Sequence, residues 1–266
     1  MITGYHAEQF ATNTPKPART PPSWLLLHGF TGSASDWAGI WPAAHPALAI
    51  DLPGHGQSPD PEKEFSKEIQ RLLRALPETV HSLAGYSLGG RIALALMAAA
   101  PERFQRLVII SAHPGLETTS ERAARRRQDQ QWIDCLRDQG IARFATAWQH
   151  QALFHAQAAR APAAVTAQHR QRLAQRPEGL ARNLACFGLG QMPPTWTAIE
   201  AFNGELHWIT GEEDAKFTAI GKGVKHRRPA TRHDIIDDCG HNPLIEAPRK
   251  LRELLAPSPL TPAGGG

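Results

Sequence analysis

One stretch of the sequence, residues 83–91 (LAGYSLGGR), constrains the fold more than any other. It contains Gly85-Tyr86-Ser87-Leu88-Gly89, which matches the G-x-S-x-G pattern of a nucleophile elbow. An apolar run precedes the pattern and an Ala- and Leu-rich run follows it, so we expect a strand, a sharp turn and a helix. The flanking glycines are needed because a Cβ there would collide with the neighbouring strand and helix. The alternative is a chance glycine-rich turn.

The elbow strand is one of several apolar runs that we expect to be buried strands. The others are Trp24–Leu27, Ala47–Ile50, Leu107–Ile110, Leu206–Ile209 and Asp234–Ile236. Helical patterns separate most of these runs, and strands that alternate with helices predict a mostly parallel sheet flanked by helices. Loops rich in glycine and histidine follow several of the runs, at the strand ends where such sheets bind ligands.

Between residues 113 and 201 the pattern changes, because strand-like runs vanish and Ala, Arg and Gln dominate. Thr118-x-x-Glu121 is typical of a capping box that opens a helix, and Gly140 is typical of a helix stop. We expect an α/β core at 1–112 and 202–256 and an all-helical cap at 113–201 that covers the site. The Pro- and Gly-rich residues 257–266 are expected to be a disordered tail.

The composition excludes several classes of protein. The N-terminus lacks the basic and apolar regions of a signal peptide, and no apolar run approaches the ~18 residues of a membrane span. Three widely spaced cysteines, an odd number without a C-x-x-C pair, indicate free thiols in a reducing compartment. We therefore expect a cytoplasmic protein without a membrane span; the oligomeric state stays open.

The net charge of +4 and the pI of about 9.2 raise the question of a nucleic-acid partner. The basic stretches match no nucleic-acid motif and lack interleaved aromatic residues, so we expect none. Arginines also bind anionic small molecules, which is the use that we favour.

A serine hydroxyl is a weak base and nucleophile at neutral pH, so Ser87 needs a histidine, which an acid must orient. In enzymes with this elbow, the acid and then the histidine follow the serine in the chain. His241 follows the last expected strand, and Asp214 follows the strand before it, so these two are the expected partners of Ser87. Three other carboxylates compete for the acid position: Glu212, Glu213 and Asp238.

Two backbone N–H groups are expected to face a developing oxyanion. One belongs to Leu88, at the start of the elbow helix, and the other to Phe30, in the loop after the first buried strand. His28 and His55 lie in glycine-rich loops, and we expect them to support those loops rather than act as bases.

Arg91 is unusual because a cation near the start of the elbow helix opposes the helix dipole. It lies four residues after Ser87, on the same side of the helix, so we expect it to bind a carboxylate; the alternative is a solvated cation. Arg122, Arg125 and Arg126 recur at helical spacing in the first cap helix, where a solvated face is equally expected.

Four stretches resemble the α/β-hydrolase superfamily: HGFTG (28–32), DLPGHG (51–56), GYSLGGR (85–91) and GHN (240–242). More specific stretches are HPGL (113–116), GEEDAKF (211–217) and Glu121-Arg122-Ala123-x-Arg125-x-x-x-Asp129-x-x-Trp132. From about Trp24 to Leu255, the chain resembles the 2-succinyl-6-hydroxy-2,4-cyclohexadiene-1-carboxylate synthases of menaquinone biosynthesis.

The resemblance implies a lyase that eliminates pyruvate from 2-succinyl-5-enolpyruvyl-6-hydroxy-3-cyclohexene-1-carboxylate. Ser87, kept basic by His241 and Asp214, would remove a proton from this polycarboxylate small molecule. The positions that match substrate-binding residues of that family are Tyr86, Arg91, Arg125, Trp148 and Arg176. The family often has a tyrosine after the tryptophan, whereas this chain has Gln149.

Two other functions remain open. A serine hydrolase on the same fold would cleave an ester, a thioester or a carbon–carbon bond. A catalytically silent binding module usually lacks a triad member, and here all three are present. We expect neither a cofactor nor a metal, because no histidine–carboxylate cluster has ligand spacing.

Overall fold

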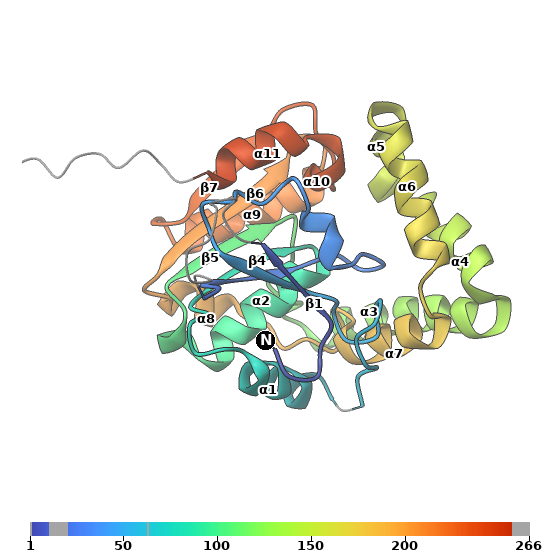
Figure 1. Ribbon diagram of the computed structural model, residues 1–266, viewed down its shortest axis with the longest axis horizontal. Helices are drawn as coiled ribbons and strands as arrows, with labels where there is room; N and C mark the ends of the chain where they lie inside the picture. The colour runs from blue at the N-terminus through green and yellow to red at the C-terminus, as the bar shows by residue number, and fades with distance from the viewer. Residues whose placement is uncertain (1, 11–20, 63, 257–266) are drawn as a thin grey trace, which may run out of the picture.

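The structure, a computed structural model, describes residues 2–10, 21–62 and 64–256. A seven-stranded sheet has the strand order β1-β3-β2-β4-β5-β6-β7, in which β1 is antiparallel to β3 and all other pairs are parallel (Figure 1). The strands are β1 (Ala7–Phe10), β2 (Trp24–Leu27), β3 (Ala47–Ile50), β4 (Ser82–Tyr86), β5 (Arg106–Ile110), β6 (Glu205–Gly211) and β7 (Arg232–Ile236). The predicted mostly parallel α/β sheet is confirmed. The predicted tail at 257–266 lies outside the described residues.

Helices cover both faces of the sheet, which explains why its central strands are largely apolar. Successive side chains of a strand point to opposite faces. Leu25 and Leu27 of β2 therefore join one core cluster and Leu26 joins the other. The first cluster is covered by α1 (Phe65–Ala75), α2 (Leu88–Ala99), α8 (Trp196–Ala201) and α9 (Ala215–Arg227). The second is covered by a short 3₁₀ helix (Ala34–Trp37), α10 (Pro243–Glu246) and α11 (Pro248–Leu255).

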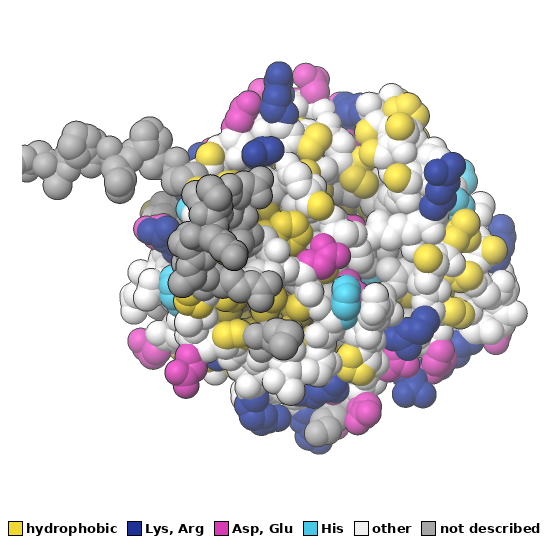
Figure 2. All heavy atoms as spheres, viewed as in Figure 1, with side chains coloured by type: hydrophobic (Ala, Val, Ile, Leu, Met, Phe, Trp, Pro, Cys, Tyr) yellow, Lys and Arg dark blue, Asp and Glu magenta, His cyan; other side chains and the backbone are white. Residues whose placement is uncertain are grey.

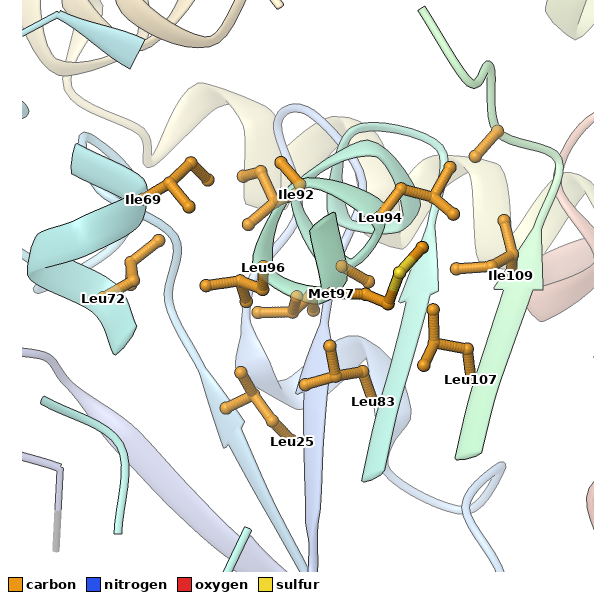
Figure 3. Packing of buried hydrophobic residues seen from close by; sticks show 14 of the residues in the cluster. Leu25, Ile69, Leu72, Leu83, Ile92, Leu94, Leu96, Met97, Leu107 and Ile109 are labelled. Carbon is orange, nitrogen blue, oxygen red and sulfur yellow. The ribbon is translucent and has the colours of Figure 1, made fainter. Parts of the chain in front are cut away.

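The elbow helix α2 is fixed by packing on two sides (Figure 3). Ile92 and Leu96 lie toward α1, and Met97 lies near Leu83 and Leu107 of the sheet. Full burial of one such side chain contributes about 1.5–3 kcal/mol. The position of the first turn of α2, which follows Ser87, is therefore set by the core rather than by a surface loop.

The chain between β5 and β6 is helical, and residues 113–195 of it are called the helical insertion below. It contains α3 (Thr119–Asp134), α4 (Gly140–Gln149), α5 (His155–Arg160), α6 (Pro162–Leu173) and α7 (Pro177–Phe187), with a π-helical segment at Cys135–Gln139. The predicted capping box is present, since the Thr118 hydroxyl accepts from the Glu121 N–H at 3.2 Å. The end of α7 and the chain after it reach the sheet's core through Phe187 and Met192, and α8 packs into the same core through Ile199.

The surface carries mixed charge. Figure 2 shows Lys and Arg side chains scattered around the rim of one face, with Asp and Glu side chains among them. None of the described helices is long and apolar enough to cross a bilayer. The expectation of no nucleic-acid partner is not tested by these observations and stays a prediction.

Candidate active site

The turn at Ser87 has the strained geometry that the glycine pattern predicts. Ser87 has φ 51° and ψ −106°, and its N–H donates to the carbonyl oxygen of Ile110 at 2.9 Å. A Cβ on Gly89 would lie 2.1 Å from the backbone oxygen of Leu27, and one on Gly85 would lie 2.4 Å from the backbone of Gly89. The close approach of β4, α2 and β2 therefore requires glycine at both positions.

Ser87, His241 and Asp214 form one hydrogen-bonded chain. His241 Nε2 lies 3.2 Å from Ser87 Oγ, and His241 Nδ1 lies 2.6 Å from Asp214 Oδ2. Asp214 follows β6 and precedes α9, whereas His241 follows β7, so neighbouring parallel strands deliver the two side chains to the same edge. Both side chains are buried, which strengthens their electrostatic interaction.

The other candidate acids point elsewhere. Glu212 accepts a hydrogen bond from the backbone N–H of Asp238 at 3.2 Å, and Glu213 forms an ion pair with Arg160. Asp238 itself sits in a turn with φ 53°. Among the acids that the sequence left open, Asp214 is therefore the one in contact with His241.

Aromatic rings surround the imidazole of His241. The ring centroids of Phe217, Tyr86 and Phe154 lie 4.5, 5.6 and 6.1 Å from that of His241. Burial raises the pKa of the Tyr86 phenol well above its usual value, so this hydroxyl is a neutral donor. The rings exclude water from the histidine and fix the plane of its imidazole.

Two buried histidines hold the loop that carries Phe30. Nε2 of His28 accepts from the Leu52 N–H at 2.9 Å, and Nε2 of His55 accepts from the Thr31 N–H at 3.1 Å. Burial lowers the pKa of both imidazoles, which keeps them neutral and able to accept. Both thus make the loop-supporting contacts expected of them. Leu88 is the first residue of α2, where a backbone N–H has no acceptor within its own helix.

A cavity of about 300 Å³ lies between the strand ends and the helical insertion. Besides Ser87 and His241, its lining includes the predicted Phe30, Tyr86, Leu88, Arg91, Arg125 and Trp148. Gln149 is not part of the lining, whereas Gln151 is. The residue that stands in place of the family's tyrosine therefore does not contact the cavity.

Arg91 and Arg125 face the cavity from two different layers. Arg91 lies on α2 and donates from Nη1 to the Phe187 carbonyl oxygen at 2.7 Å. Phe187 ends α7, and a helix C-terminus is a favourable partner for a cation. Burial, followed by repulsion from Arg125, lowers the pKa of Arg91 to about 9. Arg125 donates from Nε to Asp129 Oδ1 at 2.8 Å.

The third predicted arginine, Arg176, lies outside the cavity lining. It pairs with Asp60 Oδ1 at 2.7 Å and donates to the Ser58 carbonyl oxygen at 2.8 Å. The reason is that α6 ends at Leu173, so Arg176 directly precedes α7 as its N-cap residue and contacts the loop at 58–60. The structure therefore does not bring Arg176 to the cavity together with Arg91 and Arg125, and its role in substrate binding stays a prediction.

Arg172 takes that place and was missed by the sequence reasoning. It is 2% exposed, lines the cavity, and donates from Nε to the Thr31 hydroxyl at 3.0 Å. Its other end donates to Gln168 Oε1 at 2.7 Å, and burial lowers its pKa to about 10. Gln168 and Arg172 are four residues apart, and this helical spacing was the signal available in the sequence.

Two other arginines of α3 hydrogen-bond backbone carbonyl oxygens of neighbouring segments. Arg122 donates to the carbonyl oxygens of Leu116 and Glu117, and Arg126 donates to that of Gly190 at 2.9 Å. Lys216 and His113 also line the cavity and were not assigned to it from the sequence. Burial, Lys216 and the two nearby arginines lower the pKa of His113 to about 4, so it adds no charge near neutral pH.

Fold and site together define an α/β enzyme of the serine-triad class with a cationic cavity. The family model described as "Alpha/beta hydrolase family" matches residues 24–254. A 2-succinyl-6-hydroxy-2,4-cyclohexadiene-1-carboxylate synthase of Salmonella typhimurium is 33% identical over 246 residues, covering 88% of this chain and 92% of the relative. A Bacillus subtilis relative with the same name, given provisionally, is 31% identical over 241 residues, covering 87% and 88%.

Solved structures agree with these relatives. MenH from S. aureus has a TM-score of 0.85 and 26% sequence identity, with 94% of this chain and 96% of that chain covered. An esterase from Thermogutta terrifontis has a TM-score of 0.77 at 19% identity, covering 94% and 91%, which shows the shared fold alone. The chain therefore belongs to the alpha/beta hydrolase family and, within it, to the family of the 2-succinyl-6-hydroxy-2,4-cyclohexadiene-1-carboxylate synthases.

No group of three or more His, Cys, Asp or Glu side chains in the described ranges is placed to hold a metal ion. The expectation that the protein needs neither metal nor cofactor stays a prediction.

Proposed function

We propose that this protein is a lyase of menaquinone biosynthesis. It eliminates pyruvate from 2-succinyl-5-enolpyruvyl-6-hydroxy-3-cyclohexene-1-carboxylate and forms 2-succinyl-6-hydroxy-2,4-cyclohexadiene-1-carboxylate. The relatives above support this reaction. The observation in this chain that carries it is that Arg91, Arg125 and Arg172 line one cavity together with Ser87 and His241, the histidine that Asp214 holds from behind.

The substrate has three carboxylates: one on the ring, one on the succinyl chain and one on the enolpyruvyl group. Guanidinium groups bind carboxylates through two parallel hydrogen bonds, and such charge-assisted bonds are the strong ones. The guanidinium groups of Arg91 and Arg172 are already largely removed from water, and this burial lowers the pKa of both. A cavity of this kind suits a polyanion far better than a neutral ester.

In the proposed reaction, Ser87 acts as the base. His241 Nε2 withdraws the proton of the Ser87 hydroxyl, whose oxygen takes a proton from a ring carbon of the substrate. The electron pair of that C–H bond enters the ring π-system, and the ring C–O bond to the enolpyruvyl group breaks. The leaving enolate gains a proton and becomes pyruvate.

Charge develops during these steps at two places. Asp214 stabilises the imidazolium formed at His241 and holds its tautomer. The backbone N–H groups of Leu88 and Phe30 would stabilise the negative charge that spreads onto a substrate oxygen. We also propose that residues 113–201 act as the cap that encloses the substrate, and that the protein works in the cytoplasm without nucleic acid.

The second candidate is a serine hydrolase on the same fold. It is favoured by one observation, the 3.2 Å contact between His241 and Ser87, which also suits formation of an acyl-enzyme. The rates of the purified protein with a cyclohexene substrate and with an ester substrate distinguish the two functions. The lyase releases pyruvate from the cyclohexene substrate far faster than it cleaves a p-nitrophenyl ester, and a hydrolase shows the reverse.

A further inference from the structure

Arg160, at the end of α5, contacts two carboxylates of the core. Its Nη1 donates to Glu246 Oε2 at 3.2 Å, and its Nη2 donates to Glu213 Oε1. In Figure 1, α5 stands across from α10, the helix that ends at Glu246. Arg160 does not belong to the lining of the active-site cavity, so the substrate-binding role above does not explain it.

The Glu246 carboxylate binds the backbone of the loop that carries His241. Its Oε2 accepts from the backbone N–H of Gly240 at 2.8 Å, and its Oε1 accepts from that of Asn242 at 3.1 Å. These two amides lie on either side of His241. A Cβ on Gly240 would approach Oε2 to 2.8 Å, so the carboxylate lies directly against this loop. The Glu246 side chain is 1% exposed, and a buried carboxylate needs compensating partners.

Glu213 lies beside the triad acid, as Glu246 lies beside the triad histidine. It directly precedes Asp214, and its own N–H donates to the Cys239 carbonyl oxygen at 2.9 Å, which joins the two triad loops. The hydrogen bond from Arg160 lowers the pKa of the Glu213 carboxyl. One guanidinium therefore binds a carboxylate beside each of the two triad partners.

The same short helix also begins beside the site. Phe154, directly before α5, packs against the His241 ring, and the Arg172 guanidinium lies 5.7 Å from the Phe154 ring centroid. A displacement of α5 would thus disturb the aromatic surroundings of His241 as well as its loop.

We propose that Arg160 is a positioning residue that fastens the helical insertion to the loops carrying Asp214 and His241. Without this residue, α5 loses its ion pairs to the core and Glu246 loses the cation beside it. The 3.2 Å contact between His241 and Ser87 then becomes one of several arrangements of the loop. The inference rests on the proposed triad and not on the identity of the substrate.

The test compares Arg160→Gln with Arg170→Gln, which removes an exposed arginine from the neighbouring α6. The first readout is the rate at which diisopropyl fluorophosphate inactivates Ser87, followed as the gain in mass of the intact protein so that it does not depend on pyruvate release. This small neutral probe forms a phosphorus–oxygen bond with the Ser87 hydroxyl and expels fluoride, and it carries no carboxylate for the cavity arginines. Ser87→Ala identifies the site of reaction. The second readout is pyruvate release, analysed as kcat and KM.

We expect Arg160→Gln to lower the inactivation rate and kcat by the same factor, about tenfold or more, because small misplacements of reacting groups have effects of this size. KM should change less, and Arg170→Gln should match the wild type in both readouts. Arg160→Lys keeps the charge but not the two-sided geometry, so it should recover part of the loss. This variant also serves if Arg160→Gln folds poorly.

An inactivation rate of wild-type size in Arg160→Gln would overturn the inference, as would an effect confined to KM. A wild type that reacts with the probe at Ser87 but releases no pyruvate would remove the proposed lyase function. The inactivation rates would then still decide the role of Arg160.

Discussion

The buried guanidinium of Arg172 donates to the hydroxyl of Thr31 at 3.0 Å, which joins α6 of the helical insertion to the loop that carries Phe30. These residues are 141 positions apart in the chain. Through this contact, the arginine assigned to a substrate carboxylate also touches the loop assigned to the oxyanion. One buried side chain therefore links the cavity lining to the loop that carries Phe30.

Replacing Arg172 with alanine should lower kcat/KM strongly. Loss of one partner of a buried charge pair costs about 2–5 kcal/mol, which corresponds to a decrease of roughly 30-fold or more. Arg176→Ala is the matched control, since Arg176 pairs with Asp60 outside the cavity. Its kinetics should stay near those of the wild type. A larger effect of Arg176→Ala than of Arg172→Ala would reverse the assignment made from the structure.

Arg125→Ala should raise KM or lower kcat, whereas Arg126→Ala should do neither. The two residues are adjacent, but Arg125 lines the cavity and Arg126 donates to the backbone of Gly190. Steady-state pyruvate release measures both variants, and circular dichroism checks that each is folded. Equal kinetics in the two variants would show that Arg125 does not bind the substrate.

Gly89→Ala should destabilise the protein, because its Cβ would lie 2.1 Å from the Leu27 oxygen. Removing this clash requires a shift of β2 or α2 within a packed core, with an expected loss of about 1–3 kcal/mol. Gly223→Ala in α9 has no atom within 4 Å of the new Cβ. It should instead stabilise the helix by about 0.5–1 kcal/mol. Urea unfolding of both variants measures the two free energies, and a loss in both would contradict the steric argument.

The stability of the protein should fall as the pH drops below about 6.5. Burial lowers the pKa of His28 and His55 in the folded state below the ordinary histidine value of 6.5. Below that pH the unfolded chain binds more protons than the folded one, so protonation favours unfolding. The contribution of each histidine is complete above pH 6.5 and is lost as the pH falls toward the folded pKa.

His55→Gln tests this explanation, because the amide oxygen can replace the acceptor at Nε2 but does not titrate. Unfolding free energies between pH 5.5 and 7.5 should depend less on pH in the variant, by up to about 1.4 kcal/mol per pH unit. Identical slopes in variant and wild type would remove His55 as a source of the acid sensitivity.

The parts of the site that the sequence predicts are those set by local patterns. Ser87 lies in a glycine-flanked turn that few other local structures could replace. His241 and Asp214 each follow a strand that the sequence pattern predicts. Asp214 is favoured over Glu212 by its position after the strand, and the structure shows the contact with His241 that spacing alone does not determine. The loop-supporting contacts of His28 and His55 agree with the expectation from their neighbouring glycines.

The third arginine could not be predicted in the same way. Arg172 and Arg176 are four residues apart, so one continuous helix would place both on the same side. Because α6 ends at Leu173, Arg172 faces the cavity and Arg176 does not. That helix end depends on Pro177 and on contacts with distant loops, such as the bond from Gln175 to the Gly32 oxygen at 2.9 Å. Helix ends are the least certain part of a sequence-based prediction, and here one such end determines which arginine enters the site.

The role of Ser87 as the base of a pyruvate-eliminating lyase is the central proposal. It is tested most directly by adding purified protein to 2-succinyl-5-enolpyruvyl-6-hydroxy-3-cyclohexene-1-carboxylate and measuring pyruvate together with the absorbance of the conjugated diene. We predict that both rise in equal amounts and that Ser87→Ala abolishes the reaction. Absence of pyruvate with the wild type, alongside rapid cleavage of a simple ester, would contradict the claim.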